Sequence, residues 1–93
     1  MADIITRQKA TLLTNGQDLN NILTAGLYAA TANAIAQSIE NAPFTVSFGM
    51  IVIGGGGRTG CVQVAFSSNE IMSRKGSSSG WSKWYRYSGT VVN

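Results

Sequence analysis

Hydrophobic and polar residues alternate most clearly in the second half of the chain. Residues 46–53, Val-Ser-Phe-Gly-Met-Ile-Val-Ile, are dense in β-branched and aromatic side chains, which favours a strand. Residues 61–66 follow a period of two that places Val62, Val64 and Phe66 on one face. The glycines at 54–57 lie between these segments and are typical of a turn. The two segments therefore predict a β-hairpin.

Two more strands are predicted after this hairpin. Residues 70–74 follow a turn at 67–69, and a connection at 76–80, rich in glycine and serine, precedes a last strand at 81–87. In a regular strand Trp81 and Trp84 lie on opposite faces, because successive side chains alternate. We therefore expect at least one of these tryptophans to belong to the core.

The N-terminal half carries weaker signals. Residues 2–13 fit neither a helix nor a regular strand, so we interpret 1–15 as a lead-in or stalk remnant and 16–93 as one domain. Asp18 is expected to cap a helical turn at 19–23, and a short strand follows at 27–29. Alanines and the spacing of Ile35 and Ile39 favour a helix in 29–41, whereas Thr31, Asn33 and Ser38 weaken it, so helix and loop both stay open.

Length and composition place these elements in one small fold. Ninety-three residues support a single core, and we predict a mainly β, antiparallel meander or sandwich-like domain with one or two short helical segments. Only 12% of residues are charged, roughly half of the ~25% typical of soluble domains. A surface so poor in charge suits a subunit interface. We therefore expect a homo-oligomer.

The chemistry-bearing residues argue against catalysis and against a metal or cofactor. The chain has no histidine and one cysteine, Cys61, which is expected to be a small buried hydrophobe. Its four carboxylates show no spacing that pairs an acid with a base. Gly55, Gly57 and Gly60 match the spacing of a dinucleotide loop, but a strand rather than a helix is predicted after them, which favours a hairpin turn.

Charged residues are unevenly distributed along the chain, and the C-terminal half of the chain is basic. Its cations are scattered instead of forming a dense phosphate-binding stripe, so we predict no nucleic-acid partner. A single-strand nucleic-acid module remains a third reading because residues 81–87 combine aromatic and basic side chains. No apolar run approaches the ~20 residues that span a bilayer, so we predict no membrane insertion.

Several short segments resemble the knob domain at the tip of bacteriophage tail fibres and pyocin fibres. The resemblance covers about residues 16–87. It is carried by the following residues: Asp18-Leu19-Asn20, Ile22, Leu23, Gly26, Tyr28, Ala32-Asn33-Ala34, Asn41-Ala42-Pro43, Gln63-Val64-Ala65-Phe66, Asn69-Glu70-Ile71-Met72-Ser73-Arg74 and Gly80-Trp81-Ser82-Lys83-Trp84. It implies a homotrimeric fibre tip at 16–93 that binds a bacterial surface receptor, either a lipopolysaccharide sugar or an outer-membrane protein.

The expected function is therefore a receptor-binding tip module, located in a virion tail fibre or phage-derived particle after synthesis in the bacterial cytoplasm. Its expected partners are two further copies, the rest of the fibre and the receptor. The alternative is a trimerisation cap without receptor contact. In either case Ile and Val side chains from 46–64 are expected in the trimer interface. The residues expected to bind the receptor are Asn69, Arg74, Lys83, Trp84 and Tyr85.

Overall fold

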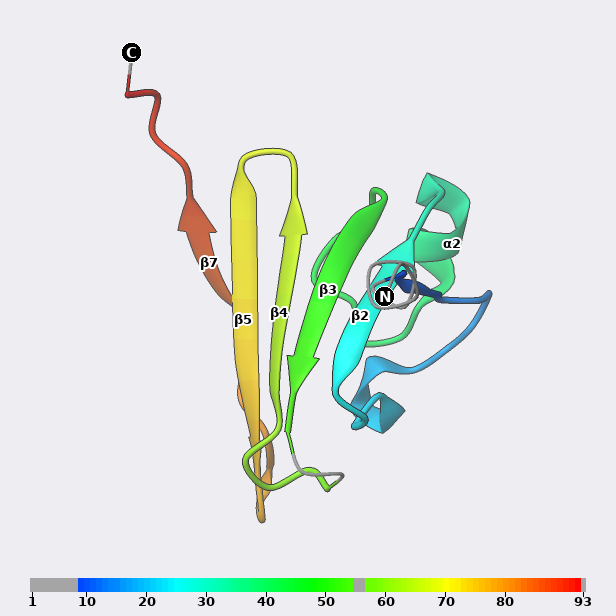
Figure 1. The fold of residues 1–93 in the computed structure, drawn as a ribbon, viewed down its shortest axis with the longest axis vertical. Coiled ribbons are helices and arrows are strands. Elements are labelled where there is room, and N and C mark those ends of the chain that lie inside the picture. Colours follow the sequence, from blue (N-terminus) through cyan, green and yellow to red (C-terminus); the bar gives the residue numbers. More distant parts are fainter. Residues whose placement is uncertain (1–8, 55–56, 93) are drawn as a thin grey trace, which may run out of the picture.

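A single sheet organises the fold, and a helix and loops pack against one of its faces (Figure 1). The computed structural model describes residues 9–54 and 57–92. Its strands are β1 (Thr11–Leu12), β2 (Gly26–Ala30), β3 (Phe48–Ile53), β4 (Val62–Ser67), β5 (Glu70–Ser77), β6 (Gly80–Trp81) and β7 (Tyr85–Ser88). Its helices are the 3₁₀ turn η1 (Leu19–Asn21) and the α-helix α2 (Asn33–Ser38).

The strands form a meander in the order β1-β2-β3-β4-β5-β6, and β7 also pairs with β5. Every pairing is antiparallel except β1 with β2. The prediction of a mainly β, antiparallel domain is thus confirmed. The helical turn expected at 19–23 is η1, and α2 decides the open question at 29–41 in favour of a short helix.

One face of the sheet forms the core. On β3 the residues Phe48, Met50 and Val52 point inward and are buried. They meet Leu19 of η1 and Ala36 of α2, together with the remaining core residues Leu13, Ala30, Ile39, Cys61 and Ala65. Cys61 is fully buried, as predicted. Since Val52 is used inside the subunit, it is not available to an interface.

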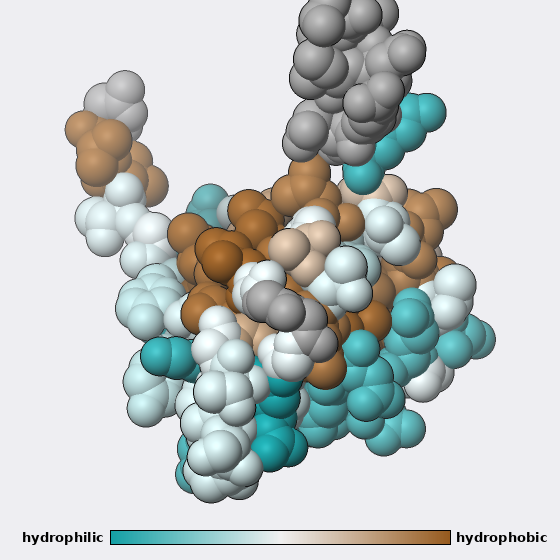
Figure 2. Space-filling view, turned by 60° about the horizontal axis from the view of Figure 1, so that its bottom comes forward, coloured by the Kyte–Doolittle hydropathy of each residue, from teal (hydrophilic) through white to brown (hydrophobic). Residues whose placement is uncertain are grey.

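The opposite face is apolar and exposed, and we call it the open sheet face. The register aligns Ile51 with Val64, Ser73 and Tyr85 across four strands. Figure 2 shows hydrophobic residues gathered over a broad area of the surface. The exposed large side chains of the open sheet face are Ile51, Ile53, Phe66, Ile71, Tyr85 and Tyr87, and Leu27, Val62 and Val64 are half-buried on the same face.

The sheet begins earlier than the sequence predicted. Thr11–Leu12 pair in parallel with β2, and the backbone N–H of Leu13 donates to the carbonyl of Ala29 at 2.8 Å. Leu13 is buried in the core. The expected lead-in therefore contributes its last residues to the domain, and the rest of that prediction, at 1–8, lies outside the described residues.

The connection expected at 76–80 is part of a paired hairpin. β5 continues to Ser77 and returns through a tight hairpin to β6. Arg58 binds this hairpin, because its Nε and Nη2 donate to the carbonyls of Ser77 and Ser78, each at 2.8 Å. Glycine and serine content predicted only a connection, whereas an arginine far away in the sequence supplies hydrogen bonds that hold the turn.

The prediction of one continuous strand at 81–87 is wrong. Gly76 pairs with Trp81 and Ser73 pairs with Tyr85, so residues 82–84 stand opposite only residues 74–75. One extra residue on one strand is a β-bulge, and it shifts the alternation of side chains by one position. As a result Trp81 and Trp84 lie on the same side of the sheet, not on opposite faces.

Candidate functional site

A groove of about 570 Å³ opens beside this bulge, on the core side of the sheet. We call it the Trp groove. Four parts of the chain meet there: η1, the segment after α2, the turn before β4, and the region from β5 through the bulge. Its lining residues are Asn20, Asn41, Ala42, Arg58, Arg74, Gly80, Trp81, Ser82, Lys83 and Trp84.

Arg74 lies at the centre of this site between two indole rings. Its guanidinium carbon is 4.1 Å from the ring centroid of Trp81 and 4.8 Å from that of Trp84. Both distances lie within the ~6 Å range of a cation–π contact, which is stronger when desolvated. The side chain is only 6% exposed. Arg74 therefore supports both rings from the inside.

Gln63 connects this arginine to the helical turn. Its Oε1 accepts a hydrogen bond from Arg74 Nε at 2.8 Å. Its Nε2 donates to the carbonyls of Leu19 at 2.7 Å and Ile22 at 3.0 Å. Gln63 is fully buried, and buried polar groups are stable only when they are hydrogen-bonded. The network therefore fixes η1 against β4 and β5.

A second network orients Trp84. Its Nε1 donates to the carbonyl of Asn41 at 3.0 Å, and Asn41 Nδ2 donates to Asp18 Oδ1 at 2.7 Å. Asn41 has a φ of 63°, a left-handed conformation that asparagine adopts more readily than most residues. Asp18 Oδ1 also accepts from the backbone N–H of Asn20 at 2.9 Å, which confirms the predicted cap.

The groove is electropositive. Burial lowers the pKa of Arg74 to about 10, against the opposing attraction of Asp18 and Cys61, so the guanidinium is charged at neutral pH. Hydrogen bonds from the Asn20 backbone and the Asn41 side chain hold the pKa of Asp18 below its usual value. Asp18 itself does not line the groove, and the three charged lining residues are the cations Arg58, Arg74 and Lys83.

Two buried polar atoms of lining residues have no hydrogen-bond partner within the described part of the chain. They are Arg74 Nη2 and Asn20 Oδ1. One is a donor and the other an acceptor, so the site retains unused hydrogen-bonding capacity of both kinds. Leaving such atoms unpaired costs roughly 1–3 kcal/mol each.

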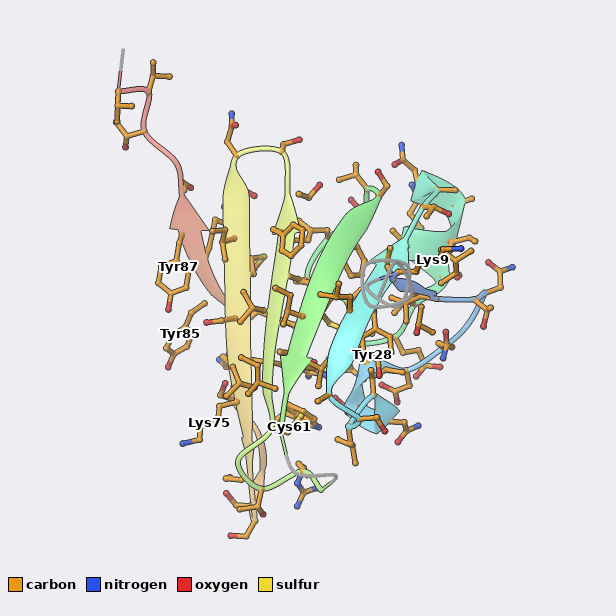
Figure 3. The ribbon with its side chains drawn as sticks, viewed as in Figure 1. Lys9, Tyr28, Cys61, Lys75, Tyr85 and Tyr87 are labelled. Carbon is orange, nitrogen blue, oxygen red and sulfur yellow. The ribbon has the colours of Figure 1, made fainter. Side chains whose placement is uncertain are left out.

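The structure brings together three of the five residues expected to bind a receptor. Arg74, Lys83 and Trp84 line the groove. Tyr85 is 61% exposed on the open sheet face, where Figure 3 shows it beside Tyr87. Asn69 lies in the β4–β5 turn at the other end of the sheet.

Sequence reasoning did not assign Asn20, Asn41, Gln63 or Trp81 to the site. Their spacing along the chain gives no periodic signal. The available signal was that all four fall within the segments that resemble fibre knobs. The structure shows that these separate segments converge on one groove.

The described residues give little support for a metal site, a reactive cysteine or a dinucleotide loop. Within 9–54 and 57–92, no three His, Cys, Asp or Glu residues are grouped as metal ligands would be. Burial raises the pKa of the Cys61 thiol, which disfavours the reactive thiolate. Gly57 and Gly60 are followed by β4 and not by a helix, and Gly55 lies outside the described residues. Among the described residues no helix is long and apolar enough to cross a bilayer.

Comparison with known proteins gives a structural relative. No family model and no curated protein matches this sequence. The fold is similar to that of an N-truncated R2-type pyocin tail fibre, with a TM-score of 0.73 and 21% sequence identity. The match covers 85% of this chain and 34% of that fibre chain, so the domain corresponds to about a third of the relative. The described residues therefore have the fold of a tail-fibre domain, as the resemblance predicted.

Proposed function

We propose that this chain is a receptor-binding module of a phage or phage-like tail fibre, and that it recognises a bacterial surface glycan or outer-membrane component through the Trp groove. The observation that carries this proposal is the groove itself. It combines two aromatic rings with cationic and amide side chains beside the sheet. The tail-fibre fold supports the proposal that the chain is part of a fibre.

A glycan suits this lining better than an apolar ligand does. A sugar ring presents hydroxyls and an apolar face, which match the polar groups and an indole surface. The volume of about 570 Å³ lies within the ~300–1,000 Å³ range of small-molecule sites. We propose binding without catalysis, because the groove lining holds neither a histidine nor a carboxylate to act as general acid or base.

The role of Trp84 can be tested on host cells. Trp84→Ala should weaken cell binding by roughly 1–4 kcal/mol, the range for a well-packed aromatic anchor. Flow cytometry with labelled protein measures the effect, and the melting temperature shows whether the variant is folded. Tyr87→Ala is the matched control for loss of an exposed aromatic side chain outside the groove, compared at the same oligomeric state because Tyr87 lies on the open sheet face.

Two comparisons make this test decisive. Cells lacking surface polysaccharide should retain less protein than the parent cells if the receptor is a glycan. A folded Trp84→Ala variant that binds cells as well as the original chain would place the receptor site elsewhere. Tyr85 and the turn at Asn69 would then be the next candidates.

The second candidate function is a trimerisation cap, and the open sheet face favours it. We propose that three copies pack through this face, with Ile51, Ile53 and Val64 in the interface. An exposed apolar surface that spans several strands is unusual for a monomer and typical of an association site. Tyr85 lies in the same face, which supports a subunit contact for it. Failure of a folded trimer to bind host cells would favour the cap alone.

A further inference from the structure

The charged side chains that line the Trp groove are all cations, and Asp18, which attracts Arg74, lies outside the lining. Lys83 and Arg58 are exposed at the groove, and Arg74 lies beneath it. Within the described residues the ion pair found is Arg86 with Glu70 at 3.9 Å, and neither residue lines the groove. No carboxylate of the lining neutralises the three cations. An anionic ligand would therefore enter a favourable potential.

The arginine beneath the groove is an incompletely used donor. Arg74 is 94% buried, taken from its exposed fraction of 6%, and its Nη2 has no hydrogen-bond partner. Its Nε is already used by Gln63. The acceptor Asn20 Oδ1 is likewise buried and unpaired. Both atoms are buried beneath the lining, so a ligand in the groove meets the positive charge of Arg74 and not a hydrogen bond from it.

Arg58 is held in position before any ligand arrives. Two hydrogen bonds to the carbonyls of Ser77 and Ser78 fix its guanidinium while the residue stays exposed. Less side-chain entropy is then lost on binding, because the cation is already ordered. Lys83 is not restrained by a side-chain hydrogen bond among those found in the described chain, so it can adjust to the ligand.

We propose that the Trp groove is selective for acidic saccharides, meaning a sugar ring that carries a carboxylate. The ring stacks on the exposed surface of an indole, and the carboxylate lies toward Lys83 and Arg58. This inference rests on the proposed function, because it specifies the class of glycan that the groove binds. A neutral sugar would use the aromatic and amide groups and leave the cations without a partner.

Tryptophan fluorescence, excited at a wavelength that tyrosine does not absorb, reports on this site. The chain contains two tryptophans, and both line the groove. D-glucuronate and D-glucose share one ring and differ in carrying a carboxylate or a hydroxymethyl group. Titrations at matched ionic strength should give a saturable change with both, with glucuronate binding at least about fivefold more tightly, the effect of one favourable charge contact.

Two charge-removing variants assign the selectivity to the groove. Lys83→Gln should weaken glucuronate binding by roughly three- to tenfold and leave glucose binding unchanged. Lys75→Gln is the matched control, because Lys75 is an exposed cation on the opposite face of β5 and should have no effect (Figure 3). Equal affinity for the two sugars, or an unchanged Lys83→Gln variant, would overturn the proposal.

Two further ligands separate acidic sugars from other anions. Inorganic phosphate that binds as tightly as glucuronate would indicate a general anion site and refute sugar selectivity. A short single-stranded oligonucleotide that binds more tightly than glucuronate would also refute sugar selectivity and would indicate a nucleic-acid site. Host-cell binding together with equal affinity for glucose and glucuronate would refute only the acidic-sugar inference. Glucuronate selectivity without host-cell binding would support this inference and count against the receptor function.

Discussion

Replacing Gln63 with leucine is expected to lower the free energy of unfolding by about 3–5 kcal/mol, because three buried or partly buried polar partners lose their hydrogen bonds at once. These partners are Arg74 Nε and the carbonyls of Leu19 and Ile22. Leucine has a similar size, so the loss reflects polarity and not a cavity. Small domains are stable by only about 5–15 kcal/mol, which makes this effect easy to measure by urea denaturation.

Gln37→Leu is the matched control for this prediction, because Gln37 is exposed on α2. It should change stability by less than about 0.5 kcal/mol, as is usual for surface substitutions. The double variant Gln63→Leu with Arg74→Met should be less destabilised than the sum of its single changes, since each leaves the other partner unpaired. A Gln63→Leu chain as stable as Gln37→Leu would contradict the central role of this network.

Replacing Ile51 with lysine is expected to dissociate the proposed trimer. Ile51 lies in the middle of the open sheet face on β3. A buried charge without a partner costs several kcal/mol, and a symmetric trimer would contain three copies of it. Multi-angle light scattering should therefore show the original chain as a trimer and Ile51→Lys as a monomer at micromolar concentration.

Ala34→Lys is the matched control, because it adds the same positive charge away from the open sheet face. Ala34 is exposed on α2, on the other side of the sheet from Ile51. This variant should stay trimeric. Ile51→Lys should keep its circular dichroism spectrum, because the side chain is outside the subunit core. If Ile51→Lys remained a trimer, the interface would have to lie on another surface. If the original chain were a monomer, the trimer proposal would be refuted.

Local sequence patterns were sufficient to predict those features that depend on contacts between residues close together in the chain. The β-branched run before Ile53 and the alternation in β4 correctly predicted two paired strands. Asp18 was recognised as a cap because the bond to the Asn20 backbone spans only two residues. The tail-fibre fold was also anticipated, from short segments whose shared resemblance the structural match confirms at the level of fold.

The candidate site was only partly predictable, because its contacts join residues far apart in the sequence. Arg74 was expected to be on the surface with Lys83 and Trp84, yet it is buried between two indole rings. Tyr85 was expected beside them, but the bulge at 82–84 leaves it on the open sheet face. A one-residue bulge reverses which side of a sheet a side chain occupies, and composition carries no signal of it.

The sequence by itself determined the class of fold, the strands β2 to β5, the cap at Asp18 and the burial of Cys61, because these depend on period, propensity and local hydrogen bonds. Tertiary structure alone decided that both tryptophans share one side of the sheet. It also decided that Gln63 links Arg74 to η1, and that the open sheet face stays exposed. These features arise from the pairing of β5 with both β6 and β7 and from packing across the core. Both kinds of contact join residues far apart in the sequence, so local sequence patterns do not predict them.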